Sequence, residues 1–218
     1  MKRIIEIIAI ALLATMAISC EKNDDGIKDY PYNMDIVSCL PQTNSIYFEQ
    51  ILPYDQGSAL LIPDPAITGN VEKGQRVLMQ YYDKGNVDSV TKSIEVIQVA
   101  SILSDTIENL SLDSINTFKN DVLKLTSMWR TGDYLNLNIM INYSSRPHGL
   151  SLLYDLNQNM TDTLDVYLRH NDNGDPMGYW AQTYVSYYIP NFNNYQVLRI
   201  NTKLYDMVEN YVTMKIKE

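Results

Sequence analysis

Residues 134–143 alternate aliphatic with mostly polar side chains, and this period of two constrains the fold more than any other feature of the chain. The aliphatic positions are Leu135, Leu137, Ile139 and Ile141. A helix would scatter these side chains around its circumference, whereas a β-strand places all of them on one face. We therefore predict a strand here, with one face turned toward a hydrophobic core.

Other runs of the same kind recur along the chain, separated by glycine, proline, asparagine and aspartate residues typical of turns. They lie at 45–52, 59–62, 75–82, 93–103, 122–128, 150–156, 163–170, 182–189, 195–201 and 210–216. The pattern predicts an all-β protein, with a small barrel or sandwich over residues 44–103 and an antiparallel β-sandwich over residues 121–218. Residues 104–120, rich in aspartate, serine and asparagine, are interpreted as a linker.

The amino terminus has the anatomy of a secretory signal. Lys2 and Arg3 precede an apolar run over residues 4–18, and small residues lead up to Cys20. This is the pattern of a bacterial lipobox, in which cleavage leaves the cysteine as a lipid-bearing N-terminus. The run is shorter than the roughly 20 residues that cross a bilayer. We expect a signal peptide over residues 1–19 and attachment to the membrane through lipid on Cys20.

Residues 20–43 are interpreted as an acidic tether, because the stretch after Cys20 is polar and charged. An acidic cluster directly after a lipidated cysteine also resembles the surface-export tag of some Gram-negative lineages. We expect an outer-membrane lipoprotein of a Gram-negative bacterium. A plain spacer and an export tag both fit, so display on the cell surface stays open at this point.

The net charge limits the classes of molecule that the chain can bind, and the number of cysteines limits its disulfide bonds. The formal net charge is −9 and no basic patch with interleaved aromatic residues is present, so we expect no nucleic-acid partner. The chain has two cysteines. With Cys20 committed to lipid, Cys39 is buried, reactive or paired with another chain, and its apolar neighbours Ile36, Val37 and Leu40 favour burial.

The segment His170–Asp175 is a conspicuous polar cluster. Calcium takes about six to eight oxygen ligands, and Asp172, Asn173 and Asp175 are candidates for some of them. No acidic residue follows at the EF-hand spacing. A β-turn, with positive φ angles at Asn173 and Gly174, is the favoured alternative.

Catalytic patterns are weak. His148 and His170 are the only histidines, and neither has an adjacent metal-ligating residue. No serine lies in a G-x-S-x-G elbow. A pair of carboxylates is recognised by its separation in space, which a sequence does not give. We expect no catalytic residue, no metal and no cofactor.

Four aspartate–serine/threonine–aliphatic triplets resemble the acceptor of a periplasmic O-glycosylation system. The candidate acceptors are Ser89, Thr106, Ser114 and Thr163. Glycans at these positions would add bulk and solubility to the surface.

Three segments resemble the NigD-like lipoproteins. They are residues 74–78 (GQRVL), 129–136 (WRTGDYLN) and 168–175 (LRHNDNGD). The likeness extends from about Ser45 to Lys217, and it departs from the family pattern at Asp172, where a small residue is usual. The resemblance implies an N-terminal OB-like barrel and a C-terminal β-sandwich. It connects the chain to the bacteriocin locus from which the family takes its name, but it supplies no catalytic residue.

These features predict a lipid-anchored accessory or binding protein of the cell envelope. Its partner would be a protein or a glycan, in a role connected with bacteriocin self-protection. Two alternatives stay open. One is an envelope hydrolase that uses carboxylates such as Asp133 or Asp175, and the other is a structural surface component that assembles through exposed strand edges.

Overall fold

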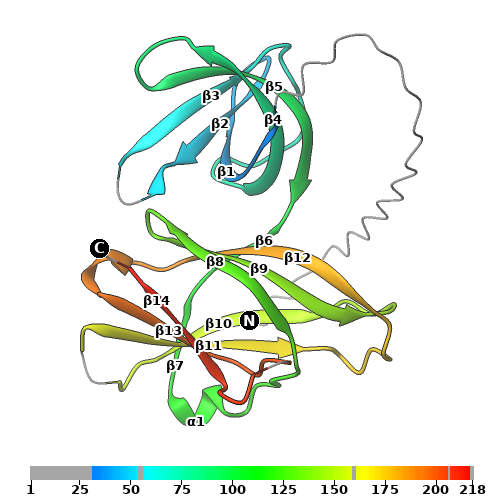
Figure 1. Ribbon diagram of the computed structural model, residues 1–218, viewed down its shortest axis with the longest axis vertical. Helices are drawn as coiled ribbons and strands as arrows, with labels where there is room; N and C mark the ends of the chain where they lie inside the picture. The colour runs from blue at the N-terminus through cyan, green and yellow to red at the C-terminus, as the bar shows by residue number, and fades with distance from the viewer. Residues whose placement is uncertain (1–30, 54–55, 159–160, 206, 217–218) are drawn as a thin grey trace. The chain divides into compact units, whose positions relative to one another are not determined.

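The computed structural model describes residues 31–53, 56–158, 161–205 and 207–216 (Figure 1). The predicted signal peptide, Cys20 and the first part of the tether lie outside the described residues. The described chain is all-β, as predicted, with a five-stranded closed barrel followed by two sheets that form a sandwich. Within these ranges no helix is both long and apolar enough to cross a membrane.

The barrel is built from five strands. They are β1 (Asn33–Pro41), β2 (Ile46–Ile51), β3 (Ser58–Pro63), β4 (Arg76–Asn86) and β5 (Thr91–Ser101). The order is β1-β2-β3-β5-β4, closed by pairing of β4 with β1, and only β3 and β5 run parallel. The barrel has its own core, which includes Val37, Phe48 and Leu61. Cys39 is buried there as a free thiol, as predicted, and burial raises its pKa to about 11.

Strand β1 corrects the predicted tether, which does not extend over Asn33–Pro41. The barrel begins at Asn33 rather than at residue 44. Residues 36–39 are buried in succession, because one face of β1 meets the barrel core while Ser38 on the other accepts a hydrogen bond from Arg76. Such a run lacks the alternation by which a half-buried strand is recognised.

The sandwich consists of a four-stranded and a five-stranded sheet. The four-stranded sheet has the order β6 (Leu103–Thr106), β12 (Tyr179–Tyr188), β9 (Tyr134–Tyr143) and β8 (Lys124–Thr131). The five-stranded sheet has the order β14 (Tyr211–Lys215), β13 (Val197–Asn201), β11 (Thr163–Asn171), β10 (Gly149–Asp155) and β7 (Glu108–Leu110). Two short helices, α1 (Leu112–Ile115) and η2 (Phe192–Asn194), complete the domain.

Residues 104–120 are not a linker, which is a second correction. They contain most of β6, all of β7 and α1. Strand β6 pairs in parallel with β12, and β7 pairs in parallel with β10, so the chain passes from one sheet to the other. Ile107 and Ile115 anchor the segment in the interior. These short polar strands are stabilised by pairing with the longer strands β12 and β10. No hydrophobic period therefore marks them in the sequence.

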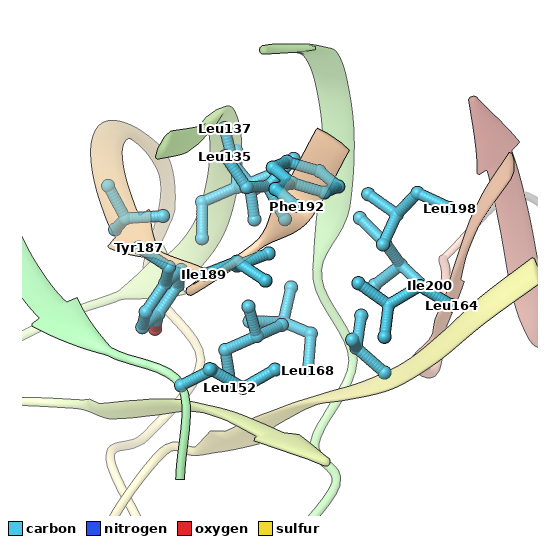
Figure 2. Close-up of a cluster of buried hydrophobic side chains, with 14 of the residues drawn as sticks. Leu135, Leu137, Leu152, Leu164, Leu168, Tyr187, Ile189, Phe192, Leu198 and Ile200 are labelled. Atoms are coloured by element: carbon cyan, nitrogen blue, oxygen red, sulfur yellow. The ribbon is translucent and has the colours of Figure 1, made fainter. Parts of the chain in front are cut away.

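The sandwich core lies between the two sheets and confirms the alternation seen in residues 134–143. All four aliphatic side chains of β9 are buried, and Figure 2 shows Leu135 and Leu137 in the same cluster as Leu164, Leu168 and Ile200 of the opposite sheet. Burying a side chain of this size stabilises the fold by about 1.5–3 kcal/mol. The same alternation turns the remaining side chains of β9 outward.

A buried arginine connects the barrel to the four-stranded sheet. Arg76, the first residue of β4, is 1% exposed. Its guanidinium donates to Ser38 Oγ at 3.1 Å, and to Ser186 Oγ and Asn136 Oδ1 at 3.3 Å each. It also lies 4.3 Å from the centroid of the Tyr134 ring. Burial lowers the pKa of Arg76 to about 10, so the side chain stays charged at neutral pH.

Replacing Arg76 with lysine should lower the free energy of unfolding by about 1–3 kcal/mol, because one ammonium cannot replace the arginine's fork of donors to buried acceptors. Equilibrium urea unfolding followed by circular dichroism measures the change. Arg199→Lys is the matched control, since Arg199 forms a partly exposed ion pair with Asp165 at 3.2 Å. Its loss should stay below about 1 kcal/mol. Equal losses in both variants would contradict the role assigned to Arg76.

Candidate functional site

Asp175 joins two loops of the sandwich, one between β9 and β10 and the other between β11 and β12. Its carboxylate accepts the backbone N–H groups of Ser144 at 2.7 Å and of Ser145 and Arg146 at 3.0 Å, and its side chain has no exposed surface. Burial by itself would raise the pKa of Asp175. The hydrogen bonds from these N–H groups and from His148 outweigh that effect and lower the pKa to about 2.

Two buried imidazoles continue the chain of contacts from Asp175. His148 Nε2 lies 3.3 Å from Asp175 Oδ2, and His148 Nδ1 lies 2.8 Å from His170 Nε2. His170 Nδ1 lies 3.2 Å from the carbonyl oxygen of Asp121. All three contacts join a donor to an acceptor when one ring carries two protons and the other carries one. Burial lowers the pKa of His170, which favours a neutral His170 and places the second proton on His148, beside the Asp175 carboxylate.

All four imidazole nitrogens are engaged in contacts within this network. The nearby serine lies in the wrong place for a triad. Ser145 Oγ is 3.3 Å from Asp175 Oδ1, so the serine contacts the carboxylate rather than the base. The arrangement fastens two loops together.

The calcium candidates lie in a turn whose polar groups are already satisfied. Asn173 and Gly174 have φ angles of 53° and 67°, which confirms the predicted turn. Asp172 Oδ1 accepts the N–H of Gly174 at 2.8 Å, and the Asn173 amide donates to the Pro147 carbonyl at 2.6 Å. Asp175 is occupied by the loop donors. Over the described ranges, no three acidic, histidine or cysteine side chains gather where they could hold a metal ion. The geometry therefore does not favour calcium at Asp172, Asn173 and Asp175.

Asp133 and Asp175 do not form a carboxylate pair. Asp133 directly precedes β9, whereas the backbone groups that bind Asp175 directly follow it. A strand of ten residues separates its ends by about 30 Å. Glycosidase carboxylates lie about 5–9.5 Å apart, so these two residues cannot act on one bond.

The four candidate glycosylation sites differ in accessibility. Ser89, between β4 and β5, and Thr106, at the end of β6, are exposed. Ser114 is half-buried, with its Oγ 2.9 Å from Ser111 Oγ, and Thr163 begins the central strand β11. Accessibility favours Ser89 and Thr106, and modification at all four sites stays a prediction.

The outer surface of the four-stranded sheet is a second candidate site, which the sequence analysis did not single out. We call it the polar face and define it by rows of cross-strand neighbours on β12, β9 and β8 (Figure 1). The rows are Tyr188–Tyr134–Thr131, Ser186–Asn136–Trp129, Tyr184–Asn138–Ser127, Gln182–Met140–Lys124 and Trp180–Asn142. The asparagines at alternate positions of β9 were the sequence feature that could have indicated this face. Their neighbours could not be identified without the pairing of β9 with β12.

Three side chains on the polar face hold one another in place. The Gln182 amide donates to Asn138 Oδ1 at 3.0 Å and to the Tyr184 oxygen at 3.2 Å, and the Asn138 amide donates to the same oxygen at 3.4 Å. The hydroxyl proton of Tyr184 and Oε1 of Gln182 have no hydrogen-bond partner within the described part of the chain. Gln182 is exposed and Tyr184 is half-buried. A fixed donor and a fixed acceptor therefore remain available.

Aromatic side chains border this group. The ring centroids of Trp180 and Tyr205 are 5.0 Å apart at an interplanar angle of 71°. Lys124 Nζ lies 4.3 Å from the Trp180 centroid and 4.5 Å from the Tyr205 centroid, in cation–π contact with both rings. Lys124 is the single charged member of the rows that define the polar face.

Comparison with known proteins relates the chain to a family. A family model described as the NigD-like C-terminal β-sandwich domain matches residues 106–217, which is more than half of the chain. No curated protein matches the sequence.

Three solved structures share the fold. A protein of unknown function from Bacteroides vulgatus is 19% identical with a TM-score of 0.69, covering 86% of this chain and 90% of its own. A Bacteroides fragilis protein provisionally described as a lipoprotein is 11% identical with a TM-score of 0.64, covering 85% and 98%. A NigD-like immunity protein from Bacteroides caccae is 18% identical with a TM-score of 0.61, covering 84% and 91%.

Acidification should weaken the fold through His170. Burial, followed by the charge of His148, lowers the pKa of His170 in the folded chain. The unfolded chain, with a histidine pKa of about 6.5, therefore takes up the proton first. The contribution of His170 to the free energy of unfolding is complete above about pH 6.5. It declines as the pH falls toward the folded-state pKa, by up to about 1.4 kcal/mol per pH unit. Urea unfolding between pH 7.5 and 5 measures this decline.

His170→Gln should remove most of this dependence. NMR titration of the His170 ring in the unaltered protein tests the same point without a substitution, and the ring should stay neutral below pH 6.5. An unchanged pH slope in the variant, or a His170 ring that titrates at its ordinary pKa, would show that burial of this ring is not responsible.

Proposed function

Since the chain belongs to the NigD-like family, we propose that it is a lipid-anchored binding protein of the bacterial cell envelope that performs no catalysis. The polar face carries this proposal, because it combines fixed but unused hydrogen-bonding groups with aromatic rings on an extended surface. Tyrosine and tryptophan supply large, rigid contact areas, and asparagine and glutamine supply directional hydrogen bonds. By contrast, the titratable groups of the loop network are fully engaged in structural contacts.

Attachment to the outer membrane is supported by the lipobox at Cys20 and by the fold shared with the Bacteroides fragilis protein provisionally described as a lipoprotein. Bacteroides is a Gram-negative genus. The barrel begins at Asn33, which is 33 − 20 = 13 residue steps from Cys20. Those steps span at most about 45 Å. A lipid on Cys20 would therefore keep the barrel close to the membrane, whichever face of the outer membrane it occupies.

A role in bacteriocin self-protection is the second candidate. It is favoured by the immunity function named for the Bacteroides caccae structure. We propose this role as a more specific form of partner binding.

Assembly through strand edges is less favoured by the geometry. The two sheets end in β8 and β14 on the same side of the sandwich, and Arg130 of β8 donates to the Ile216 carbonyl, next to β14, at 3.4 Å. A register shift between Leu125 and Ser127 bends β8. Bulges of this kind commonly protect an edge strand against pairing with another chain.

Cys20→Ala should move the protein from the membrane fraction to the aqueous fraction, because residue 20 can then no longer carry the proposed lipid. Cell fractionation with mass spectrometry of the mature N-terminus measures both location and lipid. Cys39→Ala is the matched control and should remain with the membrane, since the Cys39 thiol lies in the barrel core. A Cys20→Ala protein that still sediments with membranes would contradict the anchor.

Protease treatment of intact cells distinguishes the two faces of the outer membrane. Digestion of the protein would support display on the cell surface, and full protection would support the periplasmic face.

A further inference from the structure

We infer that the polar face binds a neutral carbohydrate chain. This inference rests on the proposed function, because it names the partner of the proposed binding protein. Three properties of the polar face carry it: its charge, its unused hydrogen-bonding groups and its bordering aromatic rings.

The charge of the polar face favours an uncharged ligand. Lys124 is the single charged residue in the rows that define the polar face. Its ammonium group is already in contact with the Trp180 and Tyr205 rings. A single occupied cation does not make a site for a polyanion, which binds through several basic groups. The formal net charge of −9 further disfavours anionic polymers.

The hydrogen-bonding groups fit sugar hydroxyls. A sugar hydroxyl donates and accepts at once, so adjacent hydroxyls need a donor and an acceptor side by side. The Tyr184 hydroxyl proton and Gln182 Oε1 are such a pair, and the bonds among Gln182, Asn138 and Tyr184 hold them in position before a ligand arrives. Fixed groups lose little side-chain freedom on binding, which favours affinity.

The aromatic border supplies the apolar part of the site. Trp180 and Gln182 are two residues apart on β12 and on the same face, which places them about 7 Å apart. This separation is on the scale of one pyranose ring. The C–H groups of a sugar pack against an aromatic ring while its hydroxyls face polar side chains. Lys124 holds the Trp180 and Tyr205 rings together through its cation–π contacts.

A protein partner fits this surface less well. The centre of a protein–protein interface is usually apolar, whereas the centre of the polar face contains Asn138, Gln182 and Tyr184, with Met140 as its single aliphatic member. A strand surface is extended rather than concave, so it suits a polymer better than a small molecule. We therefore assign the face to a polysaccharide and treat a protein as an outcome of the test.

The two tryptophans of the chain provide a built-in probe, because Trp129 and Trp180 are both on the polar face. Full-length protein purified from membranes in detergent is titrated with soluble yeast mannan, barley β-glucan, xylan and dextran. Binding of at least one polysaccharide should change the tryptophan emission and retard the protein in affinity gels. In Trp129→Phe the remaining signal comes from Trp180 and should still respond.

Tyr184→Phe and Gln182→Leu should weaken binding of the responding polysaccharide at least tenfold, because each removes a hydrogen-bonding group and keeps most of the side-chain volume. Tyr211→Phe is the matched control. It removes an exposed tyrosine hydroxyl from β14, in the other sheet, and should bind like the unaltered protein.

The absence of a response to all four polysaccharides would overturn the inference, as would equal binding by Tyr184→Phe and Tyr211→Phe. One further result would overturn it: the unaltered chain recovers a membrane protein, Tyr184→Phe does not recover that protein, and no polysaccharide binds to either. Cell fractionation tests the proposed lipid anchor at Cys20 separately. A protein that stays on the membrane but ignores polysaccharides contradicts this inference alone, whereas a Cys20→Ala protein that stays on the membrane contradicts the proposed function.

Discussion

The buried guanidinium of Arg76 is the interaction on which the connection between barrel and sandwich depends. A charge that leaves water must be surrounded by hydrogen-bonding groups, or the fold loses several kcal/mol. Here the acceptors are neutral, and they come from β1 of the barrel and from β9 and β12 of the sandwich. Asn136 and Ser186 of the polar face are therefore committed to structure. The rows farther along the same strands keep unused groups, so one surface serves both connection and, by our proposal, recognition.

Strand β9 has a different polar network beyond its other end. There the carboxylate of Asp175 and the imidazolium of His148 fasten two loops, with His170 and a backbone carbonyl completing the chain of contacts. The side chains of Asp175, His148 and His170, which are of types often found in active sites, here stabilise the fold by holding two loops together. The polar face, by contrast, presents amides, hydroxyls and aromatic rings, which are groups that bind ligands. This contrast between the two parts of the sandwich is the basis of our proposal of a binding protein.

Much of the fold was predictable from the sequence. The strand at residues 134–143, the turn at Asn173 and Gly174 and the burial of Cys39 all follow from local patterns, and the structure confirms them. The boundaries were less predictable. Strand β1 is buried on consecutive residues and hides its period, while β6 and β7 are polar strands that exist through their neighbours. The polar face was missed because its rows combine β8, β9 and β12, whose register no local pattern specifies.

The sequence by itself determined which side chains share a face of each strand, because the alternation of a strand is a property of the local backbone. It also contains the lipobox-like pattern that ends at Cys20, on which the proposed lipid anchor rests. The tertiary structure alone decided that His148 meets His170, 22 residues away, and Asp175, 27 residues away. It also decided that Gln182 and Tyr184 meet Asn138 across two strands. Such meetings depend on pairing between distant segments, and hydrophobic periodicity carries no information about which distant segments pair.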